Sequence, residues 1–377
     1  MPNVIYTALT SAKLLPLLAQ WQAKYPAMGV FALLPEAEQQ LLPVLQSACR
    51  QHNIRLLGGI FPSLLIDSGF ANSGVLLFLF KQLPPAFILP DINQSKTEAG
   101  QQISQAVNNL LNNSMQTTPT LFLLIDAMLP NINSILDNLY LQLANRVRYA
   151  GINAGSETFQ PMPCLFDESQ IVANGVLGML LTDPAIFHVE HGYPAPDHVM
   201  MASSSNNNCI SSIDWCPAFD MYQQIIKRDY AIELTRDNFY NYAVHYPFGI
   251  LRANGEVVVR IPVALTEDGS IYCVGEVPEN AMLVLLRAPD LITSSCLDKI
   301  TAKLPSPSSQ QTLLTFYCAG RRMHLGESAI TEVADLKTRS HSHTVAGALS
   351  LGEVGARESD YPIFHNAALV CAAWPDA

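Results

Sequence analysis

In the first part of the chain, short apolar runs alternate with longer amphipathic stretches. Apolar runs of this length predict buried strands, and apolar residues at helical spacing predict helices. Strands that alternate with helices predict an α/β layer with a largely buried sheet. Gly58 and Gly59 predict a turn that ends the third strand. The predicted strands are residues 3–8, 28–34, 54–59, 74–80, 86–92, 119–127 and 175–181, and the predicted helices are residues 11–24, 36–52, 98–113 and 131–145.

The pattern changes after residue 185, where polar and apolar residues alternate over short stretches. This period of two predicts antiparallel sheet. Asn254-Gly255 and Asp268-Gly269 predict hairpin turns between strands. We therefore predict an α/β (α+β) fold of two domains, residues 1–213 and 214–377, with mixed sheets flanked by helices. The later strands are predicted at 248–253, 256–264, 270–277, 282–287, 312–318 and 364–374, and the later helices at 215–228, 238–244, 290–304 and 327–336.

Composition and charge narrow the classes of function. The chain has 377 residues, of which 49% are hydrophobic and 14% are charged, so it can bury a large core in more than one domain. A formal net charge of −11 without a basic stripe argues against a nucleic-acid partner. The longest apolar runs are shorter than the roughly 20 residues of a membrane-spanning helix, and the N-terminal residues lack a signal-peptide pattern. We expect a cytoplasmic protein with no membrane insertion, whose eight cysteines are reduced and include no CxxC pair.

The stretch 237–250, DNFYNYAVHYPFGI, holds the main candidate for a functional site. A short aromatic helix is expected to end there, because Pro247 moves Tyr246 out of the α region. His245 would then lie between helix and loop, where it could present a ring nitrogen to a cavity as the axial ligand of a flat apolar cofactor such as haem. The alternative is a hydrogen-bonded, half-buried histidine with a structural role. The side chains expected to line the cavity are Phe239, Tyr242, Tyr246 and Phe248.

Other residues support different hypotheses. His198 is the rival of His245 as a haem ligand. His188, Glu190 and His191 resemble a zinc cluster, but successive residues of a strand face opposite sides, so the three cannot converge without a bulge. The chain has no GxSxG motif, HExxH motif or pair of catalytic carboxylates, which argues against an enzyme.

Motifs spread over nearly the whole chain resemble those of one known family. They are GGIFP at 58–62, CPAFDMY at 216–222, HYPFGI at 245–250, CAGRRMHLGE at 318–327, and GALSLGEVG followed by FHNAALVCAAW near the C-terminus. Together they resemble the FIST domain proteins, in which an N-terminal and a C-terminal FIST region are paired. The motifs near the C-terminus are the more specific.

This resemblance implies a cytoplasmic sensory module of bacterial signalling. A FIST chain with a histidine just ahead of the YPFG motif resembles the NosP-type branch, whose members bind haem, sense nitric oxide and act on a partner histidine kinase. For this chain the resemblance implies haem b, with His245 as our candidate for the axial ligand and Arg321 and Arg322 as partners of the propionates. The two arginines could equally form a solvated edge after their strand. The other residues predicted around the haem are Phe239, Tyr242, Tyr246 and Pro247.

The alternative is a non-haem module that holds an amino acid or a similar metabolite in the cleft between the two FIST regions. The two hypotheses differ in whether the protein can carry a Soret band. The expected partners are nitric oxide or another small ligand, and a sensor histidine kinase. The chain could also form a homodimer.

Overall fold

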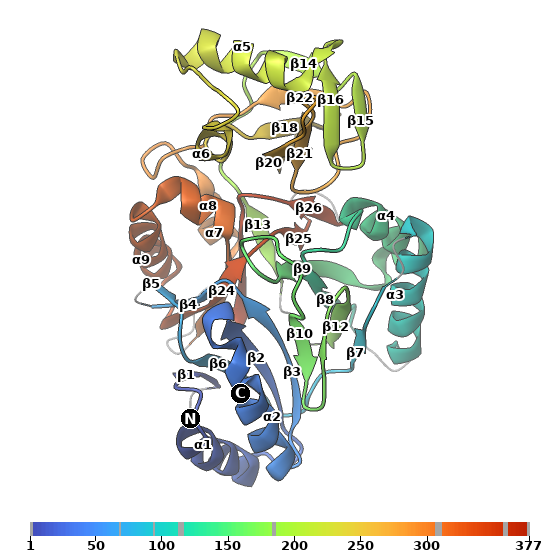
Figure 1. Ribbon diagram of the computed structural model, residues 1–377. Helices are drawn as coiled ribbons and strands as arrows, with labels where there is room; N and C mark the ends of the chain where they lie inside the picture. Colours follow the sequence, from blue (N-terminus) through green and yellow to red (C-terminus); the bar gives the residue numbers. More distant parts are fainter. Residues whose placement is uncertain are drawn as a thin grey trace.

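The computed structural model describes residues 3–67, 69–92, 95–111, 117–182, 186–305, 311–356 and 361–374. The chain forms several mixed β-sheets flanked by helices, arranged as a larger body and a smaller domain at one end of it (Figure 1). The predicted α/β class, with mixed sheets in two domains, is confirmed. The predicted division of the sequence between residues 213 and 214 stays a prediction.

The body consists of three units that repeat one order of elements. Each unit has an edge strand, a helix, a strand, a helical segment, a second strand, a hairpin and a last strand. In the third unit, the smaller domain is inserted between the edge strand and the first helix. The first unit contains β1 (Val4–Thr7), α1 (Ser11–Lys24), β2 (Gly29–Pro35), η1 (Glu36–Leu41), α2 (Leu42–Gln51), β3 (Arg55–Phe61), β4 (Leu64–Ile66), β5 (Gly69–Ala71) and β6 (Val75–Phe80). The second contains β7 (Ala86–Leu89), α3 (Lys96–Leu110), β8 (Thr120–Asp126), α4 (Ile132–Leu143), η2 (Ala144–Arg146), β9 (Arg148–Ala154), β10 (Leu165–Asp167), β11 (Ile171–Val172) and β12 (Val176–Leu181). The third contains β13 (His188–Glu190), α7 (Cys296–Lys303), β23 (Thr312–Cys318), α8 (Ala319–Leu325), α9 (Ser328–Ser340), β24 (Thr344–Ser350), β25 (Glu353–Gly355), β26 (Ile363–His365) and β27 (Leu369–Trp374).

The three units exchange hairpins, so that no sheet of the body comes from one unit alone. At the centre of each six-stranded sheet lies a parallel pair: β2 with β3, β8 with β9, or β23 with β24. The last strand and the edge strand of the same unit continue the sheet on one side, antiparallel to each other. On the other side, the hairpin β10–β11 joins the first sheet, β25–β26 joins the second and β4–β5 joins the third. This cyclic exchange interlocks the units.

A glycine occupies the same place in the second strand of every parallel pair. Gly58, Gly151 and Gly347 are each the fourth of seven residues, in β3, β9 and β24. A Cβ atom at these positions would lie 2.3, 2.6 and 1.7 Å from the carbonyl oxygen of the residue paired with it. Only glycine permits so close an approach of the two backbones. Because Gly58 and Gly59 lie inside β3, the prediction that they form a turn at its end is wrong.

The smaller domain has two antiparallel sheets with its helices packed against them. Their orders are β14-β22-β18-β19 and β15-β16-β21-β20, with β17 paired to β16. Asn254-Gly255 connects β18 to β19 and Asp268-Gly269 connects β20 to β21, so both predicted hairpin turns are confirmed. The elements are β14 (Val199–Met201), β15 (Ser204–Asn206), β16 (Cys209–Ile213), β17 (Cys216–Pro217), α5 (Ala218–Tyr230), α6 (Phe239–Ala243), β18 (Phe248–Leu251), β19 (Val257–Arg260), β20 (Pro262–Leu265), β21 (Ile271–Cys273) and β22 (Met282–Leu285).

Several other predicted elements differ in the structure. The strand predicted at 256–264 is divided into β19 and β20, which belong to different sheets, and helix α8 was not predicted. The helix predicted at 290–304 begins only at Cys296, because the Asp290 carboxylate accepts hydrogen bonds from the amides of Ile292 and Thr293 and holds that segment in a turn. The strand predicted at 364–374 is divided into β26 and β27 by a turn in which Ala367 has a φ of 56°. Residues 112–113 of the helix predicted at 98–113, and residue 185, lie outside the described residues.

Because two strands approach closely at each of these glycines, replacing one of them by alanine should lower the stability of the protein. Gly347→Ala should lower the free energy of unfolding by about 1–3 kcal/mol, because the new methyl group meets the Thr315 carbonyl and forces the strands apart. Urea denaturation would measure the change. Leu141→Ala is the control: its side chain is 80% exposed on α4, so it should change stability by under about 0.5 kcal/mol. Equal stability of Gly347→Ala and the wild type would show that the strands can move apart at little cost.

Candidate functional site

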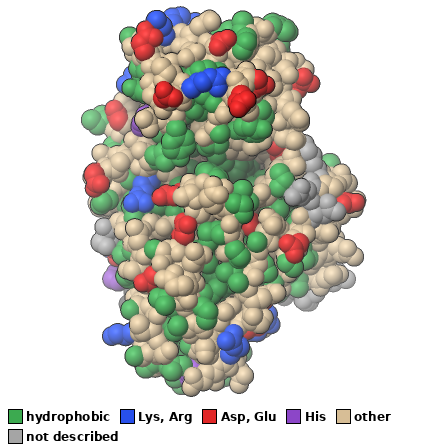
Figure 2. All heavy atoms as spheres, in the orientation of Figure 1, with side chains coloured by type: hydrophobic (Ala, Val, Ile, Leu, Met, Phe, Trp, Pro, Cys, Tyr) green, Lys and Arg blue, Asp and Glu red, His purple; other side chains and the backbone are tan. Residues whose placement is uncertain are grey.

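The candidate site is a cleft between the smaller domain and the body. It lies at the carboxyl ends of two parallel pairs, β8–β9 and β23–β24, which is where open α/β sheets commonly bind ligands. The cleft contains two cavities that share Phe159, Val263 and Val274 as lining residues. Figure 2 shows hydrophobic side chains gathered around the hollow below the smaller domain.

The first cavity, called here the apolar cavity, encloses about 540 Å³ of space, part of it open to solvent. The body contributes the start of α8, from Cys318 to Gly320, together with Met323. The smaller domain contributes Ile261 from the segment between β19 and β20, and Tyr240 from α6. An apolar group therefore fits between the two walls.

The second cavity, called here the polar cavity, encloses about 910 Å³, again part of it open to solvent. The body contributes Asn153 from β9 and Asn131 from the N-terminus of α4. Within the described part of the chain, the side-chain oxygens of both residues are buried without a hydrogen-bond partner. Such groups are rare in folded proteins. The smaller domain contributes the lining residues Asn207, Asn208, Cys273, Gly275 and Glu276.

A carboxylate bridges the two walls of the polar cavity. Glu276 of the smaller domain accepts hydrogen bonds from the backbone amide of Ser134 at 3.0 Å and from its hydroxyl at 2.5 Å. Ser134 lies in the first turn of α4, where amides lack partners within the helix and the helix dipole favours a negative charge. Glu276 thus caps α4 and ties the smaller domain to the body.

His245 forms a second bridge between the smaller domain and the body; it lines neither cavity, although its neighbour Val244 lines the apolar cavity. Its Nδ1 lies 2.7 Å from Nδ1 of His324 on α8, and Nε2 of His324 lies 3.2 Å from the carbonyl oxygen of Pro289. Because that carbonyl accepts, His324 carries its proton on Nε2, and its Nδ1 accepts from His245. Burial lowers the pKa of both histidines, and His245 lowers that of His324 further, so the neutral forms are favoured. The lone pair of His245 is therefore on Nε2.

The aromatic residues predicted around His245 pack into the core of the smaller domain. Phe239 is 3% exposed and contacts Phe219 and Tyr222 at centroid distances of 5.9 and 5.8 Å. Tyr246 lies against Tyr230, at 4.5 Å between centroids. The remaining predicted residues, Tyr242, Pro247 and Phe248, line neither cavity, and Tyr242 and Phe248 belong to the same core.

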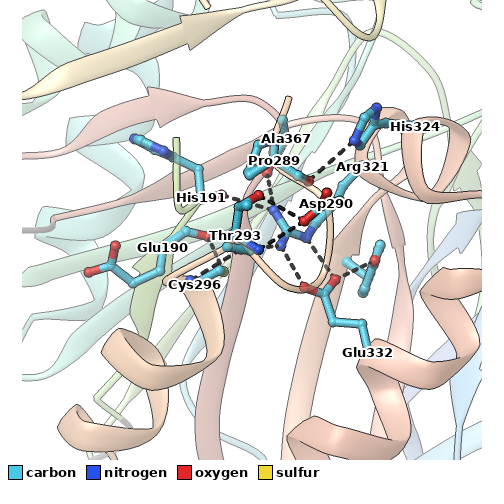
Figure 3. A network of polar contacts seen from close by, with 12 residues as sticks. Glu190, His191, Pro289, Asp290, Thr293, Cys296, Arg321, His324, Glu332 and Ala367 are labelled. Atoms are coloured by element: carbon cyan, nitrogen blue, oxygen red, sulfur yellow. Dashed lines mark hydrogen bonds and ion pairs between the residues drawn. The ribbon is translucent and has the colours of Figure 1, made fainter. Parts of the chain in front are cut away.

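Arg321 is the centre of a buried network (Figure 3). It is 3% exposed and forms an ion pair with Glu332 at 2.6 Å, and Glu332 also accepts a hydrogen bond from the Tyr317 hydroxyl. Its guanidinium also donates to the carbonyl oxygen of His191 at 2.9 Å. Burial lowers the pKa of Arg321, but Cys296, Glu332 and Tyr317 together raise it above its ordinary value. Every guanidinium nitrogen of Arg321 thus has a protein acceptor, and the residue is not the solvated edge considered from the sequence.

Arg322 and His198 lie apart from this network. Arg322 stacks over the Phe70 ring, with 4.6 Å between the guanidinium carbon and the ring centroid. His198 is exposed on the loop before β14. The structure therefore brings neither of them to His245.

The three residues of the hypothetical zinc cluster have separate partners. Glu190 pairs with Lys303 at 2.7 Å, and His191 bonds to the Val257 carbonyl oxygen at 3.0 Å. His188 is half-buried on β13. Over the part of the chain that the structure describes, no group of three His, Cys, Asp or Glu side chains could hold a metal ion.

Polar groups that sequence reasoning missed lie around the start of α8. The thiol of Cys318 borders the apolar cavity and accepts a hydrogen bond from the Ala367 amide at 3.1 Å; burial raises its pKa and keeps it protonated. Burial also raises the pKa of Glu353 to about 8, and the Ser350 hydroxyl donates to this carboxyl group. One feature of the sequence could have identified this site: Cys318 lies at the carboxyl end of a predicted strand, where α/β sheets place ligand-binding residues.

The fold is that of a two-domain α/β module with a cleft between the domains, and two models of known families match the chain. The FIST N domain model matches residues 28–215, and the FIST C domain model matches residues 218–356. The chain belongs to the FIST domain proteins, and FIST domains are sensory modules of signalling proteins. A search of curated proteins found no match. Among the described residues, no helix has both the length and the apolar character needed to cross a membrane.

The Arg321 network predicts that a buried ion pair contributes much more to the free energy of unfolding than an exposed one. Glu332→Gln should lower the free energy of unfolding by about 3 kcal/mol, because it leaves the Arg321 charge buried without a carboxylate. Asp298→Asn is the matched control, since its pair with Arg339 is 73% and 45% exposed and should contribute under about 1 kcal/mol. Urea denaturation of both variants checks this. Similar losses in both would mean that water reaches Arg321.

Proposed function

We propose that this protein is a sensory module that binds a small molecule in the cleft between the smaller domain and the body, and that it acts on a partner signalling protein rather than as an enzyme. The observation that carries the proposal is the pair of adjoining cavities at the carboxyl ends of β8–β9 and β23–β24. Membership of the FIST family supports the sensory role.

The cleft walls belong to different domains, and this is the basis of the proposed signal. A ligand that touches both walls favours the arrangement in which the walls are correctly spaced. The bridges Glu276–Ser134 and His245–His324 are the polar contacts that would adjust when that spacing changes. A surface that includes either bridge could then differ between the free and bound states.

Haem is the second candidate for the ligand, with His245 as its axial ligand. The observation in favour is the tautomer: Nδ1 of His245 donates to His324, so Nε2 has the lone pair that iron requires. The aromatic core around Phe239 does not fit the predicted haem pocket, because its rings already pack against one another. When bound, haem would supply the site for nitric oxide. The propionate roles of Arg321 and Arg322, the histidine kinase partner, the homodimer and the cytoplasmic location stay predictions.

The apolar cavity can be tested with N-phenyl-1-naphthylamine, an uncharged dye that fluoresces in apolar sites. We expect the dye to bind the wild type, and Met323→Trp to weaken binding at least about tenfold by filling the cavity mouth. Met282→Trp is the matched control, because Met282 is 51% exposed, against 45% for Met323, and lies on β22 away from both cavities. If the wild type does not bind the dye, or Met323→Trp binds it equally well, the cleft is not the site.

An absorption spectrum tests the haem candidate. Protein titrated with haem and reduced should show a Soret band that moves on addition of nitric oxide, and His245→Ala should shift or abolish the band because the axial nitrogen is lost. His198→Ala should leave the band unchanged. Loss of the band in His198→Ala alone would transfer the role to His198, and no band in the wild type would remove haem from consideration.

A further inference from the structure

The two cavities of the cleft differ in chemistry but adjoin each other. The apolar cavity is lined by apolar side chains such as Ile261 and Met323, whereas the polar cavity combines apolar side chains with asparagines and Glu276. Phe159 belongs to both linings and has a φ of 53°, a conformation that bulky residues rarely adopt. Its ring therefore lies where a ligand would pass from one cavity into the other.

The charges around the polar cavity favour an uncharged group. The described residues that line it include Glu276 but no lysine, arginine or histidine. A bound anion would be repelled by Glu276, and a cation would lie at the N-terminus of α4, where the helix dipole disfavours positive charge. Arg260 lies behind Gly275 and donates to backbone carbonyl oxygens, so its charge offsets that of Glu276.

Two asparagines at the wall of the polar cavity have hydrogen-bonding capacity that the described residues do not use. Asn131 and Asn153 line the polar cavity, and Asn153 is 1% exposed. In the described structure, the side-chain oxygen of each lacks a hydrogen-bond partner. An amide side chain both donates and accepts, which matches a hydroxyl or amide group better than a carboxylate or an ammonium group.

We propose that the ligand of the cleft is a neutral amphiphile: an apolar chain or ring in the apolar cavity, joined to an uncharged hydroxyl- or amide-bearing head in the polar cavity. This inference rests on the proposed function, because it assigns the chemistry of the ligand that the same cleft would bind. Asn131 and Asn153 select the head, while Ile261 and Met323 hold the apolar part.

The experiment is displacement of N-phenyl-1-naphthylamine by three molecules with the same six-carbon tail: hexyl β-glucoside, hexylamine and hexanoate. We expect the glucoside to displace the dye at concentrations at least about tenfold lower than either charged molecule. Asn153→Leu and, at the more accessible position, Asn131→Leu should each weaken the glucoside about tenfold while dye binding is retained. Asn145→Leu, at an exposed site in η2, should leave both unchanged.

Each outcome decides the inference. Displacement by hexylamine or hexanoate at concentrations as low as those of the glucoside overturns it, as does failure of the glucoside to displace bound dye. So does unchanged glucoside binding in folded Asn131→Leu. In these three cases the dye still binds, so the proposed function stands. Absence of dye binding to the wild type overturns the proposed function and the inference together.

Discussion

The exchange of hairpins between the three units is the constraint on which the rest of the structure depends. Without the hairpin from another unit, β3, β9 and β24 would each be an exposed edge with unpaired backbone groups. These three strands also contact one another, so the units meet at the centre of the body. Because every sheet needs strands from two units, no unit can complete its core alone, and we expect the body to form cooperatively. The glycines at the fourth position of these strands permit the close backbone approach that this centre requires.

The position of the cleft follows from this architecture. The second and third units bring the carboxyl ends of β8–β9 and β23–β24 to the same cleft. The smaller domain is inserted into the third unit between β13 and α7, and it covers those ends (Figure 1). The body alone would present a polar edge with Asn153 and an apolar edge with Cys318, both open to water. The insertion turns these two edges into adjoining cavities, which explains why the site draws on residues 127–366 rather than on one motif.

The sequence predicts the strands, helices and turns that neighbouring residues determine. It does not predict features that depend on pairing between segments far apart in the chain. Apolar runs located many of the strands and most of the helices within a few residues, and the two turn dipeptides located two hairpins. The hairpins β4–β5 and β10–β11 and helix α8 were missed. Gly58 was misread as a turn because its role depends on Ala32 and Phe166, which its own sequence neighbours do not reveal. The same holds for Arg321, whose partner Glu332 lies eleven residues away on α9, and whose other acceptors are carbonyl oxygens just after β13 and just before β27. The aromatic cluster before His245 was recognised, but the pattern could not show that it faces the core.

A ligand held between two domains can supply free energy that shifts the equilibrium between two domain arrangements. To reverse an equilibrium between two arrangements from 1:99 to 99:1, a ligand must favour one of them by about 5.5 kcal/mol. Apolar surface that a ligand buries in only one of the two arrangements contributes about 25 cal/mol per Å² to this preference, so about 40 Å² of it offsets a contact of about 1 kcal/mol. The bridges Glu276–Ser134 and His245–His324 affect the equilibrium between the two arrangements only modestly. A hydrogen bond contributes about 1 kcal/mol net, and somewhat more when one partner is charged, as Glu276 is. The free energy of ligand binding at the apolar wall can therefore outweigh that of the hydrogen bond between His245 and His324. We infer that this hydrogen bond can form and break with the ligand rather than hold the two domains in one arrangement.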